Sequence, residues 1–189
     1  HPANYFTHRP IDAAIKLATD YDLHAEDIDS VIVDFPTFHY VDRPEPESGL
    51  DGKFSVQYAT TVALLDRKVK VATFSDKRRF AEDVKALLPR VHLNMLDDIP
   101  RSFQDCHAVV RVKTKKGKEL VERCDKPRGM WGLPLTRDER LAKFRDCCEF
   151  ALPNGHIGKV IELVEKLESL DNITELMDII RMGKAHTPE

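Results

Sequence analysis

The polar side chains at the start of the chain are the first that could take part in chemistry. Residues 1–8 read His-Pro-Ala-Asn-Tyr-Phe-Thr-His, so hydrogen-bonding side chains such as Asn4 and His8 alternate with apolar ones ahead of a predicted helix. A helix N-terminus favours anions because its first backbone N–H groups have no partner within the helix. The segment is therefore a candidate for binding an anionic ligand, and the alternative is an ordinary chain end with His8 on the surface.

Tyr58 is the second candidate. It lies in the first turn of a predicted helix that Ser55 can cap, just after residues 42–52, whose two prolines and two glycines are typical of an exposed loop. A tyrosine at this position could point its hydroxyl into a cleft beside the loop. The alternative is a core tyrosine whose hydroxyl is hydrogen-bonded inside the protein.

The common motifs of catalysis and cofactor binding are missing. The sequence contains no G-x-G-x-x-G, P-loop, G-x-S-x-G or H-E-x-x-H pattern. Its eight histidines are scattered, and no two have the spacing that places metal ligands on one face of a helix. We therefore predict no metal site.

The charge balance argues against a nucleic-acid partner. The 189 residues include 29 Lys and Arg against 32 Asp and Glu, for a net charge of −3, so there is no excess of cations to neutralise phosphates. The lysines of residues 113–118 have no aromatic residue among them, which predicts a solvated turn rather than a surface for single strands. No apolar run approaches the roughly 20 residues of a membrane span, which predicts a soluble chain without membrane contact.

The four cysteines favour a reducing compartment. Cys147 and Cys148 are adjacent and no two cysteines form a C-x-x-C pair, a pattern that suits neither a zinc knuckle nor a disulfide. We expect free thiols and a cytoplasmic protein. The chain starts at His1 without a leader pattern, and we treat it as a fragment.

The elements that must position these residues predict an α+β fold. Their order, α-β-α-α-β-β-β followed by three helices, indicates a small domain with a mainly antiparallel four-stranded sheet and flanking helices. A hydrophobic fraction of 42% is sufficient for a core. Helices are predicted over residues 10–22, 56–65 and 79–88, and strands over residues 27–35, 91–96, 107–113 and 118–124.

From Pro127 onward the pattern changes to helices only. Thr136 to Glu139 form a capping box, and residues 157–167 carry the apolar stripe of an amphipathic helix. A last short helix begins near Asn172. We therefore divide the chain into an α+β domain at residues 1–126 and helices at residues 127–189 that belong to an all-α domain.

Three segments carry motifs that occur together in one enzyme family. Residues 4–14 contain T-H-x-x-x-D-A, residues 40–58 contain R-P-x-P and then K-F-S-V-Q-Y, and residues 127–144 contain P-R-G-x-W-x-x-P-L-T and K-F. In this order they resemble the C-terminal part of the 2-methylcitrate dehydratase family (MmgE/PrpD), which also contains cis-aconitate decarboxylase. Met130 stands where many relatives carry a histidine after the glycine.

The resemblance implies a lyase or isomerase that acts on a small di- or tricarboxylic acid by proton abstraction and elimination, with no cofactor. In this family the α+β domain is inserted into a larger helical domain, the active site lies between the two, and the enzymes are usually homodimers. The partner of this chain would be the N-terminal helical part of the same protein, and the fragment alone is expected to be inactive. Dehydration is the leading reaction, and decarboxylation and epimerisation are alternatives.

The resemblance also assigns roles to residues. Tyr58 matches the active-site tyrosine of the family's S-x-Q-Y segment, a hydrogen-bond donor or acid near the substrate. Asn4 occupies the place of a histidine or another polar residue that lines the cleft, and His8 matches the T-H position. Apart from the resemblance, a polycarboxylate substrate needs several donors in one cleft, and Lys53 is a further candidate for that role. Proton abstraction beside a carboxylate also needs a base, which we expect outside this chain.

A non-catalytic function is an alternative to the enzymatic one. The apolar stripe of residues 156–170 must be covered by something. The chain could therefore be a binding or regulatory α+β module with a helical tail for dimerisation.

Overall fold

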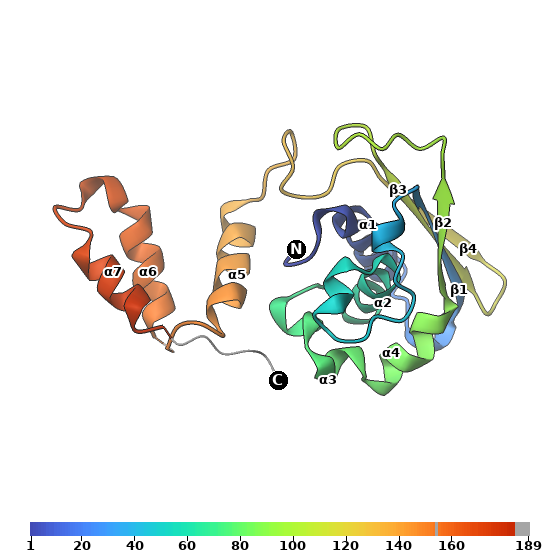
Figure 1. Ribbon diagram of the computed structural model, residues 1–189, viewed down its shortest axis with the longest axis horizontal. Coiled ribbons are helices and arrows are strands. Elements are labelled where there is room, and N and C mark those ends of the chain that lie inside the picture. The colour runs from blue at the N-terminus through green and yellow to red at the C-terminus, as the bar shows by residue number, and fades with distance from the viewer. Residues whose placement is uncertain (154, 184–189) are drawn as a thin grey trace. The chain divides into compact units, whose positions relative to one another are not determined.

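Two units make up the part of the chain that the structure describes. The computed structural model describes residues 1–153 and 155–183. Contacts within the chain group residues 1–134 into a first unit, and a second unit begins at Leu135 (Figure 1). No helix among the described residues is long and apolar enough to span a bilayer.

The first unit is built on a four-stranded sheet with the order β2-β1-β3-β4. Strand β1 pairs in parallel with β2 and antiparallel with β3, and β3 and β4 form a hairpin. The fold is therefore α+β with a mainly antiparallel sheet, as the sequence predicted. The strands are β1 (Ile28–Pro36), β2 (Val91–Leu96), β3 (Ala108–Thr114) and β4 (Glu119–Cys124).

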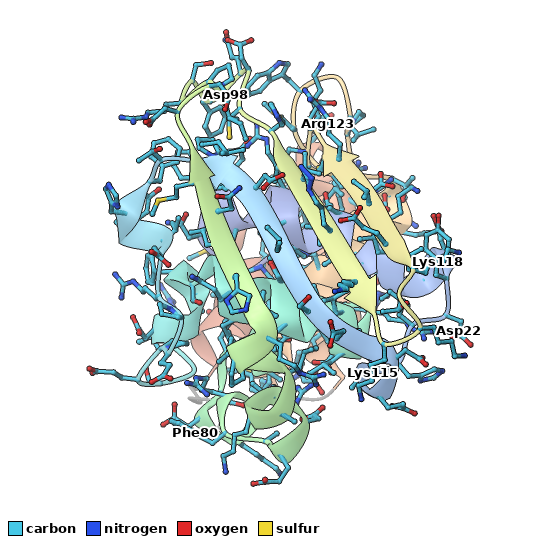
Figure 2. All side chains as sticks on the ribbon, turned by 90° about the vertical axis from the view of Figure 1, so that its right-hand side faces the viewer. Asp22, Phe80, Asp98, Lys115, Lys118 and Arg123 are labelled. Carbon is cyan, nitrogen blue, oxygen red and sulfur yellow. The ribbon has the colours of Figure 1, made fainter. Side chains whose placement is uncertain are left out.

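Helices cover one face of this sheet. Helix α1 (His8–Asp20) packs on β3 and β4, and α2 (Val56–Asp66) packs on α1 and β2. Along β1 the inward residues such as Val33 and Phe35 are fully buried, whereas the outward Ile32 is 42% exposed. Figure 2 looks onto the face that α1 and α2 leave open. The alternation of burial follows from the two-residue period of a strand.

One side chain on the open face is nevertheless buried. Asp34 is only 4% exposed because it accepts two hydrogen bonds from the guanidinium of Arg111 on β3 and one from the amide of Asn94 on β2, at 2.8 Å. These bonds join three neighbouring strands. A carboxylate with this many donors stabilises the register of the sheet.

The predicted helix over residues 79–88 is wrong in its extent. The chain forms two short helices there, α3 (Asp76–Arg79) and α4 (Glu82–Leu87). The hydroxyl of Ser75 accepts from the backbone N–H of Arg78 and so starts a helix earlier than expected, and the backbone becomes extended at Ala81.

The loop that precedes α2 is held in place by hydrogen bonds. Gly49 donates its backbone N–H to Asp76 at 2.8 Å, and the hydroxyl of Ser55 donates to the carbonyl of Arg43 at 2.6 Å. The same hydroxyl caps α2 by accepting from the N–H of Tyr58, as the sequence predicted. A Cβ at Gly49 would overlap the backbone carbonyl of Ser75. The loop is thus packed against α3.

The second unit consists of the three helices α5 (Arg137–Cys148), α6 (His156–Glu165) and α7 (Thr174–Arg181). The capping box at Thr136 is confirmed, since Thr136 and Glu139 exchange side chain to backbone bonds. Its core is small, and several large apolar side chains remain exposed. The buried core residues are Val160, Leu163, Leu176 and Ile179, and the exposed ones include Val164, Leu167, Ile173, Met177, Ile180 and Met182. Membership of these helices in a larger all-α domain stays a prediction.

We expect Gly49→Ala to lower the free energy of unfolding by at least about 2 kcal/mol, because the added methyl group must displace backbone rather than a flexible side chain. Gly158→Ala is the control, since nothing lies within 4 Å of a Cβ there and the residue is inside α6. That substitution should be neutral or stabilising. Urea unfolding measures both variants, and equal stabilities would contradict the close packing of the loop.

Candidate functional site

Two segments that are far apart in the sequence meet at the start of α1. The ring of Tyr5 stacks on Phe103 with 3.9 Å between centroids, and Phe103 in turn stacks on Trp131 at 5.6 Å. The hydroxyl of Tyr5 donates to the sulfur of Met130 at 3.3 Å. Residues 1–12, Phe103 and the turn at residues 127–131 therefore form one surface, which we name the N-terminal site.

A histidine and a carboxylate are paired in this site. Nε2 of His1 lies 2.7 Å from Oδ1 of Asp12, and the other oxygen of Asp12 accepts from the backbone N–H of Arg128 at 2.7 Å. The ring of His8 lies 5.3 Å from that of His1, and its Nε2 is 3.3 Å from the carbonyl of Ala3. A carboxylate that orients an imidazole is a common arrangement for general acid–base catalysis.

Asp12 is not among the site residues predicted from the sequence. Asp12 follows His8 by four residues in α1, so the two side chains share a helix face. That spacing could have indicated it. The contact with His1 depends on how residues 1–7 fold back, which no local pattern predicts.

Arg9 is fully buried beside the same surface, and it too is absent from the site residues predicted from the sequence. Its Nε donates to the carbonyl of Asp125 at 3.0 Å and its Nη2 to the carbonyl of Phe103 at 3.0 Å. Within the described residues it has no ion pair with a carboxylate, and its Nη1 has no hydrogen-bond partner. Burial of an unpaired cation is costly, so its carbonyl bonds and the Tyr5 ring at 5.5 Å must offset that cost. Arg9 ties α1 to the segments on both sides of the β3–β4 hairpin.

Asn4 and Lys53 are brought together through their backbones. The N–H of Asn4 donates to the carbonyl of Lys53 at 3.0 Å, and the side-chain oxygen of Asn4 accepts from the N–H of Phe6. Among the described residues nothing accepts from the amide nitrogen of Asn4, so it can donate to a ligand. The ammonium of Lys53 lies 5.8 Å from the ring centroid of Phe74.

Tyr58 is a core tyrosine, the second of the two alternatives drawn from the sequence. Its side chain is fully buried, and its hydroxyl donates to the carbonyl of Thr73 at 2.5 Å. Burial raises the pKa of the hydroxyl well above its usual value. In this structure the hydroxyl is therefore not available to a ligand. The catalytic role that the family resemblance assigned to Tyr58 stays a prediction, and the geometry of this chain does not support it.

A groove of about 640 Å³ runs between α1 and β4 and shares Asp12 and Arg128 with the N-terminal site. Four basic and four acidic residues line it, and several of them form ion pairs with one another, such as Lys16 with Asp20 at 2.8 Å and with Glu122 at 3.0 Å. Burial raises the pKa of the Cys124 thiol in this groove to about 12, so the thiol is protonated at neutral pH and is a poor nucleophile. Within the described ranges, no three His, Cys, Asp or Glu side chains gather as metal ligands would.

Comparison with known proteins gives one consistent result. The family model "MmgE/PrpD C-terminal domain" matches residues 1–169. The chain is 29% identical over 186 residues to cis-aconitate decarboxylase of Mus musculus and 28% identical over 191 residues to that of Homo sapiens, in each case across 95% of the chain. A cis-aconitate decarboxylase of Aspergillus terreus is 24% identical over 186 residues, 92% of the chain. The chain spans 38% of the length of each of these relatives.

Removal of the buried guanidinium should loosen the N-terminal site. We expect Arg9→Met to increase acrylamide quenching of Trp131, because the carbonyls of Phe103 and Asp125 lose their shared donor. Trp131 is the single tryptophan, so its fluorescence reports on the turn directly. Arg101→Met is the control, since Arg101 is exposed and pairs only with Asp97 among the described residues. Identical quenching in both variants would contradict the role of Arg9.

The position of Tyr58 yields a second prediction. We expect Tyr58→Phe to lower the free energy of unfolding by about 1–2 kcal/mol, because a buried carbonyl at Thr73 loses its donor. Tyr21→Phe, at a tyrosine that is 50% exposed, should change stability little. Chemical denaturation measures both. A tenfold fall of kcat in the complete enzyme with unchanged stability would instead support the catalytic role.

Proposed function

The chain belongs to the MmgE/PrpD family, and from that premise we propose that it is the C-terminal portion of a lyase that acts on a small tricarboxylic acid. The observation that carries the proposal is the family match over residues 1–169. An enzyme explains this match better than the alternative of a non-catalytic module, because the three relatives named above are enzymes.

Decarboxylation is the reaction that the relatives favour. All three carry the name cis-aconitate decarboxylase, so we place decarboxylation ahead of the dehydration that the motifs first suggested and ahead of epimerisation. In such a reaction the bond between a carboxylate carbon and its neighbour breaks, CO₂ leaves, and a proton is delivered to the carbon framework that retains the electron pair. The protein must therefore supply an acid and cationic or N–H donors for the remaining carboxylates.

The N-terminal site offers part of this equipment. His1, oriented by Asp12, is suited to deliver a proton, and His8 lies beside it. The amide nitrogen of Asn4 is a donor for a substrate carboxylate. The ammonium of Lys53, whose backbone carbonyl accepts from the N–H of Asn4, is a further donor from outside the N-terminal site. A tricarboxylate carries more negative charge than these groups balance, so we propose that further cations come from polypeptide outside this chain.

The N-terminal helical part of the same protein is the proposed partner of this chain. The exposed apolar side chains of the second unit, such as Ile173 and Met182, support this because helices of a larger domain would cover them. A homodimer and a cytoplasmic location are part of the same proposal, the latter supported by four free cysteines.

The complete protein should release CO₂ from cis-aconitate, and residues 1–189 alone should not. A panel with cis-aconitate, 2-methylcitrate and an epimerisable sugar acid, followed by CO₂ detection and NMR of the products, measures this. Dehydration of 2-methylcitrate without CO₂ release would replace the proposed reaction, and activity of the isolated chain would disprove the need for the helical part.

Within the complete enzyme we expect Asp12→Asn to lower kcat at least about tenfold, because His1 loses its carboxylate partner. The pH profile of kcat should change shape in this variant. Asp20→Asn, at the other end of α1 and 49% exposed, is the matched control and should leave kcat unchanged. A wild-type kcat and pH profile for Asp12→Asn would remove the pair from the mechanism.

A further inference from the structure

A separate cavity of about 430 Å³ lies at the β2 margin of the sheet. It shares no residue with the N-terminal site. We name it the Arg79 pocket, and its position can be followed in Figure 2, where Phe80, the next residue, is labelled below the end of the sheet. The lining comes from the loop before α2, from α3 and α4, and from β2 with the turn that leads into it: Pro44, Glu45, Arg79, Lys85, Leu88, Pro89, Val91 and His92.

The guanidinium of Arg79 is fixed in the wall of this pocket. Arg79 as a whole is only 8% exposed, its Nε donates to the carbonyl of Pro46 at 2.8 Å, and its Cζ lies 5.0 Å from the ring centroid of Phe80. No described residue accepts a hydrogen bond from its Nη1 or Nη2 or forms an ion pair with it. Nη1 and Nη2 of Arg79 are accessible to solvent, whereas Nη1 of Arg9 is buried. Arg79 therefore presents unused donors from a preorganised position.

The remaining lining suits an anion with a small apolar body. Lys85 adds a second cation at the rim, where its pair with Glu82 is exposed on both sides and so contributes little. Glu45, the acidic residue of the lining, is exposed and forms no ion pair with Arg79 in the described part of the chain. The side chains of Leu88, Pro89 and Val91 supply apolar wall. A cavity of this size with apolar walls and a few fixed polar groups is typical of small-molecule sites.

We propose that the Arg79 pocket binds a small oxyanion, a carboxylate or phosphate group of a low-molecular-weight compound. Two oxygens of such a group match the two Nη donors of a guanidinium, which is planar and charged at any physiological pH. Lys85 adds long-range attraction at the entrance. The proposal goes beyond the proposed function, because it concerns a cavity with none of the residues assigned to the reaction.

Calorimetric titration of the complete protein with citrate and with inorganic phosphate, at low and constant ionic strength, tests the proposal and separates the two sources of oxyanion. We expect saturable binding of at least one. Arg79→Gln should weaken it at least tenfold. Lys85→Glu, at an exposed position that should not affect folding, should weaken it severalfold. Lys77→Gln is the matched control, since Lys77 lies in α3 but does not line the pocket.

A further variant distinguishes binding in the Arg79 pocket from binding in the N-terminal site. His8→Gln in the N-terminal site should leave this binding unchanged and affect turnover only. Loss of binding in His8→Gln with normal binding in Lys85→Glu would place the anion in the N-terminal site and overturn the proposal. Absence of saturable binding for both anions would overturn it as well. If Arg79→Gln fails to fold, the test depends on Lys85→Glu. An affinity for the anion that is unchanged in Lys85→Glu would then overturn the proposal.

Discussion

The burial of Arg9 is the constraint on which the N-terminal site depends. A guanidinium without a carboxylate partner is stable inside a protein only if backbone carbonyls and aromatic faces take the place of water. Those carbonyls belong to Phe103, before the β3–β4 hairpin, and to Asp125, after it. Arg9 itself lies in α1, so its side chain links three segments of the chain. The aromatic stack of Tyr5, Phe103 and Trp131 joins these segments. The carboxylate of Asp12, which pairs with His1, also accepts from the backbone N–H of Arg128 in the turn after the hairpin.

The loop before α2 shows how packing adds to what a sequence feature predicts. Its prolines and glycines predict an exposed loop, and residues such as Glu45 are exposed. Gly49 is nevertheless buried, because the backbone of Phe74 and Ser75, just before α3, comes too close for any side chain. The same packing closes over Tyr58 and gives its hydroxyl a backbone partner at Thr73. It also places the carbonyl of Pro46 where it can orient Arg79. The same loop thus helps to bury Tyr58, to which the resemblance assigned a catalytic role. It also orients Arg79, which no sequence motif indicated.

The two units differ in how much of their apolar surface is buried among the described residues. The first has an extensive core between the sheet and α1 and α2, and its carboxylate on the open face, Asp34, is matched by Arg111 and Asn94. The second buries few side chains and leaves apolar ones such as Ile173 and Met182 exposed. This difference is the one expected of a chain that spans 38% of its relatives' length.

The sequence by itself determined the fold class, the four strands, the hairpin and the caps at Ser55 and Thr136, because these follow from local periodicity and capping chemistry. It also determined the family, through motifs in a fixed order. It could not place the break at Ala81, the partner of Asp12 or the burial of Tyr58. Those features depend on contacts between residues far apart in the chain, and only the tertiary structure decides which polar groups find partners inside it and which face solvent.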